Sequence, residues 1–178
     1  MNEDEFWKII EAAGSPSQCD PEEQCKAIAM SLSKLDKDAL IEFENIRLRL
    51  LVQAYTWPML KACFILLSYV SDDVFEDFRH WVILNGKENF YRTLKNPNEI
   101  FHYINVDDPI EEVTGEPLMM VVEEAWEGDI EEIEEKIVYP QDPEISDDWP
   151  PKDALRAEFP DLFDKFWNEK AIAEIHGK

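Results

Sequence analysis

Apolar residues in the first part of the chain recur with the spacing of an α-helix. The first set occupies positions i, i+3, i+4 and i+7 of one helix face: Phe6, Ile9, Ile10 and Ala13. Asp20 and Pro21 then start a second helix, because aspartate accepts hydrogen bonds from the free first-turn amides and proline at the first helical position loses none. That helix directs Ile28 and Leu32 inward. The pattern predicts two amphipathic helices in this region.

The next apolar segments predict helices that are buried more deeply. Asp36 is expected to cap a long helix that ends near Tyr55. Residues 36–55 carry two apolar stripes, and a helix that is apolar on two sides is packed on two sides. Trp57-Pro58 interrupts or restarts the helix, because proline disfavours a helical conformation of the residue before it. Residues 59–70 then form a mostly apolar helix. We therefore expect the helix over 36–55 to lie at the centre of the fold.

A further helix is expected to begin at Ser71, which is a natural N-cap. Asp72 and Asp73 occupy its first turn, where the positive end of the helix dipole favours carboxylates. Gly86 can adopt the left-handed conformation that closes a helix. The apolar positions of this helix share one face and are predicted to enter the core: Val74, Phe75, Phe78, Trp81 and Val82.

The second half of the chain is less regular. Thr114 is predicted to cap a helix that runs to Trp126. A short helix is marked by Ile130, Ile133 and Ile137. Its neighbouring glutamates repel each other, so the isoleucines must pack on the core to hold the helix. No segment shows strand-like alternation. The sequence therefore predicts an all-α fold, a compact multi-helix bundle of about seven to ten helices with an acidic, partly irregular C-terminal third.

The same signals divide the chain into three parts. Residues 1–138 form a helical core domain, and residues 139–151 form a loop rich in Pro and Asp. Residues 152–178 supply a C-terminal helical segment that packs on the core. A chain of 178 residues is long enough to bury such a core without disulfides or metals.

Composition indicates a reducing compartment. The three cysteines are Cys19, Cys25 and Cys63, an odd number that does not suit a disulfide framework. Residues 1–10 lack the basic and apolar regions of a signal peptide. The most apolar run, residues 60–70, is interrupted by a lysine and is far shorter than the ~20 residues that span a bilayer. We expect a cytoplasmic protein that does not insert into a membrane.

Negative charge is concentrated in the second half. Residues 1–100 contain 17 acidic and 11 basic side chains, whereas residues 101–148 contain 17 acidic side chains and a single basic one, Lys136. Such a surface repels nucleic acid and anionic lipid and attracts basic proteins. Two interpretations stay open: the charge serves solubility alone, or it steers a basic partner to the protein.

One block of residues resembles a known family. The block runs Ser71-Asp72-Asp73-x-Phe75-x-x-Phe78-Arg79-x-Trp81-x-Ile83-x-x-Gly86, and it resembles a bacterial family known as domain of unknown function 4240. The opening Phe6-Trp7 and the segment Thr114-Gly115-Glu116 fit the same pattern, so the resemblance covers about residues 3–127. The chain departs from it at Tyr69-Val70 and Val74. The resemblance implies a bacterial, helical, intracellular domain and brings no reaction with it.

Candidate chemistry lies on the helix that starts at Ser71. Asp73, Asp77 and His80 fall at i, i+4 and i+7 and could bind a cation, although a solvated polar face explains the same spacing. Arg79 is expected to pair with Asp72 or Glu76, or to grip a carboxylate or phosphate. The candidate ligand-binding set is Asp72, Asp73, Arg79 and Trp81. No catalytic residue, cofactor or metal ligand is assigned, because no nucleophile motif or metal motif is present.

Two hypotheses of function follow, and the sequence favours the first. The first is a non-enzymatic module whose acidic half binds a basic protein, as an immunity or inhibitor protein of a toxin system would. Its candidate contacts are Glu123, Trp126, Glu127, Glu131, Glu134 and Trp149. The alternative is a small-ligand or metal-binding protein, or an enzyme, with its site around Ser71 to Trp81. The sequence sets no oligomeric state.

Overall fold

The computed structural model describes residues 1–145 and 148–176, and every regular element in these ranges is helical. The N-terminal half contains six α-helices: α1 (Glu3–Ala12), α2 (Pro21–Leu32), α3 (Lys37–Ala54), α4 (Trp57–Leu67), α5 (Asp72–Leu84) and α6 (Lys87–Lys95). Shorter elements follow: η1 (Pro97–His102), α7 (Pro109–Glu112), η2 (Glu116–Met119), α8 (Val121–Ala125), α9 (Glu131–Glu134), α10 (Lys152–Glu158), α11 (Pro160–Phe166) and α12 (Glu169–His176). The all-α prediction is confirmed.

The predicted helix starts are correct because each depends on local chemistry. Asp20 accepts a hydrogen bond from the amide of Glu22, and Asp36 accepts one from the amide of Ala39. The Ser71 hydroxyl accepts from the amide of Val74, at the start of α5. Each bond satisfies a first-turn amide that the helix itself leaves unpaired.

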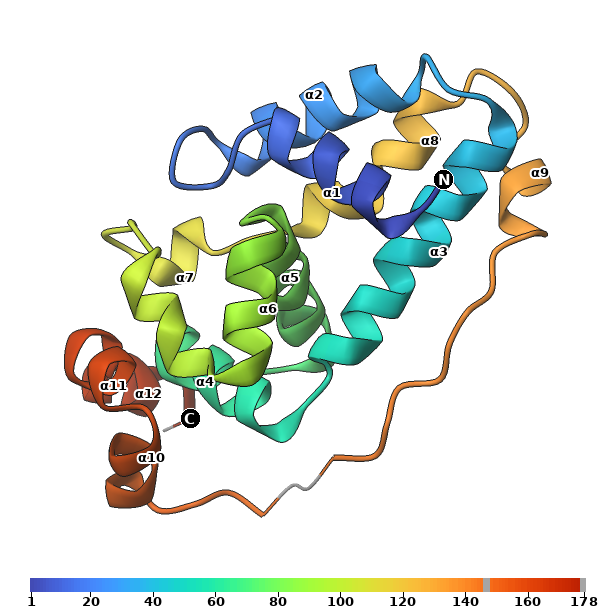
Figure 1. Cartoon of the computed structure of the whole chain (residues 1–178). Helices are drawn as coiled ribbons and strands as arrows, with labels where there is room; N and C mark the ends of the chain where they lie inside the picture. Colours follow the sequence, from blue (N-terminus) through green and yellow to red (C-terminus); the bar gives the residue numbers. More distant parts are fainter. Residues whose placement is uncertain (146–147, 177–178) are drawn as a thin grey trace.

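Helix α3 is central, as its two apolar stripes predicted. It packs against α1, α5 and α9, and Figure 1 shows it running diagonally through the molecule. Its first stripe is buried along its whole length: Leu40, Phe43, Ile46, Leu50 and Ala54. Helix α5 crosses it and contributes the largest aromatic side chains of its own face, Phe75, Phe78 and Trp81, to the same core.

One predicted helix is wrong. Thr114 caps nothing, and the expected helix to Trp126 is divided into η2 and α8, with Gly115 before η2. Gly115 is buried against the backbone of α5, a tertiary contact at the point where Thr114 was expected to cap the helix, and the chain then forms the 3-10 turn η2 before α8 begins.

The C-terminal part returns to the core after an extended stretch. Residues 138–145 run past α3, where the amide of Val138 donates to Asn45 Oδ1 over 2.8 Å (Figure 1). Helix α11 then packs against α4 and η1. Asn98 ties the two regions together, because its side chain donates to Asp161 and accepts from the amide of Leu162.

Among the described residues, no single helix is long and apolar enough to cross a membrane; α3 and α4 meet the length and composition test only as a pair, which is bent by 86°.

Candidate functional site

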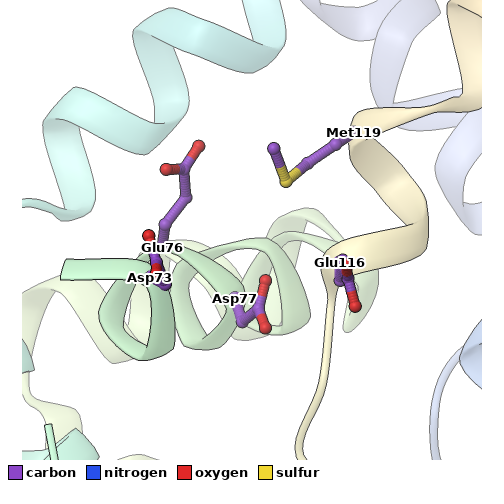
Figure 2. Close-up of a pocket in the computed structure, with 5 residues that line it drawn as sticks. All are labelled: Asp73, Glu76, Asp77, Glu116 and Met119. Carbon is purple, nitrogen blue, oxygen red and sulfur yellow. The ribbon is translucent and has the colours of Figure 1, made fainter. Parts of the chain in front are cut away.

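A hollow lined by four carboxylates lies between α5 and η2. Asp73, Glu76 and Asp77 come from α5, and Glu116 and Met119 come from η2 (Figure 2). The cavity has a volume of about 280 Å³. We call it the acidic pocket. None of its lining side chains is basic, so the protein supplies no counter-charge within it.

Gly115 explains how η2 comes so close to α5. A Cβ atom at this position would lie 2.2 Å from the backbone nitrogen of Trp81 and 2.5 Å from the carbonyl carbon of His80. Its backbone is not in the left-handed region, so glycine is needed here for space and not for its φ angle. Leu118, fully buried in the core, holds the other end of η2. Together these contacts fix Glu116 and Met119 beside α5.

Asp77 has the most perturbed carboxyl group of the pocket. Burial, and after it the neighbouring carboxylates of Glu116, Glu76 and Asp73, together raise its pKa to about 6. Figure 2 shows the carboxylates of Asp77 and Glu116 directed to the same part of the gap between α5 and η2. At neutral pH the pocket therefore holds like charges that a bound cation would stabilise.

A family model described as a protein of unknown function (DUF4240) matches residues 1–128. The chain belongs to this family. Searches of the curated proteins and of the solved structures found no match. The DUF4240 match runs from α1 through α8 and contains the whole acidic pocket, whereas α9 to α12 lie beyond it. The family resemblance predicted from the central sequence block is thus confirmed.

The four predicted ligand-binding residues of the DUF4240 region do not converge. Asp72 and Asp73 are exposed in the first turn of α5, whereas Arg79 and Trp81 are buried. Only Asp73 lines the acidic pocket. The predicted set is therefore separated by the helix itself, since its members point partly to solvent and partly to the core.

Arg79 has a different partner from the one expected. Its Nε donates to the carbonyl of Phe75, and its Nη1 donates over 3.1 Å to the carbonyl of Leu51 in the last turn of α3. The guanidinium lies over the rings of Tyr55 and Phe75. Its ion-pair contact is Asp142, at 3.9 Å, and not Asp72 or Glu76. Burial lowers the pKa of Arg79, an effect that Asp142 opposes.

His80 follows Asp73 and Asp77 at the predicted helical spacing, but it does not line the acidic pocket with them. Its side chain is fully buried beside Arg47 of α3, and no cluster of three metal-ligating side chains occurs among the described residues. Burial lowers the pKa of His80 well below its usual value, and Arg47 and Arg79 lower it further. The neutral imidazole therefore accepts a hydrogen bond from Arg47 Nη1 through Nε2.

Arg47 also belongs to a buried ion pair that sequence reasoning missed. Its Nε donates to Glu44 over 2.9 Å and its Nη2 donates to the other oxygen of the same carboxylate. Both residues lie on the buried face of α3. The only signal in the sequence was an acid and a base three positions apart among the apolar positions of that helix.

The predicted partner-binding residues occupy separate places. Glu123 is exposed on α8, Glu127 is exposed just after that helix ends, and Glu131 and Glu134 are exposed on α9. Within the chain as described, none of these four carboxylates forms an ion pair, whereas the nearby Glu132 pairs with Lys37 over 2.7 Å.

The two predicted interface tryptophans both contact other residues of the chain, and they lie in different parts of the fold. Trp126 is half-buried, and its Nε1 donates to the carbonyl of Asp129. Trp149 is 40% exposed but packs against Trp57 and Phe64 of α4. Trp149 therefore packs on α4, whereas Trp126 follows α8, a helix that packs against α2.

Asp77→Asn is expected to stabilise the protein at pH 8. A pKa raised from 3.8 to about 6 means that folding costs free energy once the group ionises. The full shift corresponds to about 3 kcal/mol, and solvent screening of this partly exposed group reduces the gain to about 1 kcal/mol. The free-energy cost of ionising Asp77 is absent below pH 3.8, grows through pH 6 and is complete above it. The stabilisation by Asp77→Asn should therefore increase over the same pH range. Urea unfolding at pH 4 and pH 8 measures it.

Asp73→Asn serves as the matched control for that measurement. Asp73 is exposed in the first turn of α5, where the helix dipole favours its charge, so its loss should destabilise the protein by roughly 0.3–1 kcal/mol. An equal stability change for the two variants at pH 8 would contradict our account of Asp77.

Proposed function

We propose that the protein is a non-enzymatic module that binds a basic partner protein through the acidic pocket and the unpaired glutamates of α8 and α9. The observation that carries the proposal is the convergence of Asp73, Glu76, Asp77 and Glu116 in one hollow whose lining contains no basic side chain. A group that raises the free energy of the folded protein, as ionised Asp77 does, is typical of a functional site. A lysine or arginine side chain from a partner would remove that cost.

The distribution of charge supports the same proposal. Glu123, Glu127, Glu131 and Glu134 extend the negative field beyond the pocket, and such a field accelerates encounter with a basic protein and excludes nucleic acid. The alternative, a small-ligand or catalytic site around Ser71 to Trp81, has less support because Arg79 and Trp81 are committed to packing.

A role in neutralising a basic toxin, as an immunity or inhibitor protein does, would use this surface. The three cysteines are free thiols, and Cys25 and Cys63 are buried. Free thiols are typical of a reducing compartment, and we propose a cytoplasmic location on that basis. Burial raises the pKa of Cys25 to about 12, so this thiol is not a ready nucleophile.

The test is affinity capture from the native cell with three versions of the chain. The wild type should retain a basic protein at low salt and lose it at high salt, because Debye screening weakens charge-steered contacts. Asp77→Asn/Glu116→Gln should reduce retention roughly tenfold. Glu23→Gln/Glu88→Gln removes the same number of charges from exposed sites outside the pocket and should retain the partner.

Two results would count against the proposal. One is the recovery of no basic protein at low salt. The other is a captured protein that the pocket variant and the control variant retain equally.

A further inference from the structure

Two exposed methionines lie where η2 ends, between the acidic pocket and a neighbouring hollow. Met119 is 40% exposed and Met120 is 45% exposed, although the residues on either side of them, Leu118 and Val121, are fully buried. Gly115 fixes the start of the same segment against α5. The methionines therefore project from a backbone that is held in place on both sides, and we call Met119 and Met120 the methionine pair.

Each methionine faces a different hollow. Met119 lines the acidic pocket, and Figure 2 shows its thioether directed into the same space as Glu76. Met120 lines a second hollow of about 230 Å³ on the side of α2. Glu22 and Lys26 of α2 line that second hollow and pair with each other over 3.4 Å, so Glu124 of α8 is the carboxylate that has no basic partner in it. The methionine pair is thus an apolar ridge with carboxylates on both sides.

The position of η2 in the fold explains this arrangement. The segment packs against α5 on one side and against α2 and α8 on the other, and Figure 1 shows the chain passing between these helices before α8. Consecutive side chains of a tight helical turn point in different directions, so Met119 and Met120 reach opposite hollows. Both side chains stay partly exposed to solvent, and this exposure costs solubility unless it serves binding.

The chemistry of this ridge specifies one kind of ligand. Methionine is unbranched and polarisable, so it adapts to the irregular apolar face of a bound segment. Carboxylates on both sides select lysine and arginine and reject acidic side chains. An amphipathic helix with an apolar stripe flanked by basic residues presents both features at once, with apolar residues at i, i+3, i+4 and i+7.

We propose that the methionine pair and its two flanking hollows bind a basic amphipathic helix of the partner protein. The apolar stripe of that helix contacts Met119 and Met120, and its basic side chains enter the acidic pocket and the hollow beside Glu124. This inference rests on the proposed function, and it adds which element of the basic partner is recognised and by what contact.

The test uses two labelled peptides of about 18 residues, about five helical turns, made of lysine and leucine. In the first peptide the leucines form one helix face, and in the second the same residues are shuffled so that no face exists. Fluorescence anisotropy with the full chain should give a Kd for the first peptide at least about tenfold lower than for the second. Met119→Gln/Met120→Gln should raise the Kd of the first peptide to that of the second.

Val138→Gln is the matched control, because Val138 is an apolar side chain that is 71% exposed and lies outside both hollows. This variant should bind the first peptide as the wild type does. If the wild type binds both peptides equally, or if the methionine variant keeps the preference, the inference is wrong and the proposed function stands on charge alone. If neither peptide binds, the proposed function itself is contradicted, and the inference with it.

Discussion

Arg47→Met is expected to lower the free energy of unfolding by about 3–5 kcal/mol, the largest effect of any single change considered. Both members of the pair that Arg47 forms with Glu44 are buried, with side chains that are 6% and 10% exposed. Removing the guanidinium leaves the carboxylate in the core without a counter-charge. It also leaves Nε2 of His80 without the donor that it now has.

A double variant separates loss of the pair from loss of packing. Glu44→Leu/Arg47→Met removes both charges and keeps apolar volume at the interface of α3 and α5, so it should recover most of the stability that Arg47→Met loses. Urea unfolding of the wild type, both single variants and the double variant completes the cycle. If the double variant is as unstable as Arg47→Met alone, the buried charge is not the cause.

Gly115→Ala is expected to destabilise the protein by about 1–3 kcal/mol and to weaken binding of the basic partner. The new Cβ would fall within 2.5 Å of backbone atoms of His80 and Trp81, and a backbone in the middle of α5 cannot turn aside as a side chain can. The segment η2 must therefore move outward. That movement takes Glu116 away from Asp77 and displaces Met119.

Gly128→Ala provides the control for this prediction. A Cβ at Gly128 would meet the ring of Trp126, and turning that ring away breaks its hydrogen bond to the carbonyl of Asp129, so stability should fall by roughly 1 kcal/mol while η2 stays against α5. Thermal unfolding compares the two variants, and capture of the partner reports the pocket. An equal loss of partner capture by the two variants would mean that the close approach to α5 is not what holds η2.

The helices themselves could be derived from the sequence because their signals are short in range. Asp20, Asp36 and Ser71 mark helix starts through bonds to amides two or three positions away, and these bonds form in the structure as expected. The two stripes of α3 likewise predicted a helix packed on both sides. The prediction at Thr114 was wrong where a distant contact intervenes: Gly115, the next residue, packs against α5, and the chain forms η2 and α8 in place of one helix.

The candidate site was only half visible for the same reason. The sequence pointed to the α5 block and included Asp73, but it grouped that residue with Arg79 and Trp81, which the fold turns into the core. It overlooked Glu116, which is 39 positions from Asp77 along the chain and faces it across the acidic pocket.

The sequence by itself determined that this chain is helical, that its second half is strongly acidic, and that it resembles DUF4240. The tertiary structure alone decided which carboxylates share a hollow, which arginine enters the core and which methionines remain in solvent. Helical periodicity and capping depend on neighbours within one or two turns, whereas the position of η2 on α5 depends on how separate helices pack. That packing is set by the whole core at once, and no short stretch of residues specifies it.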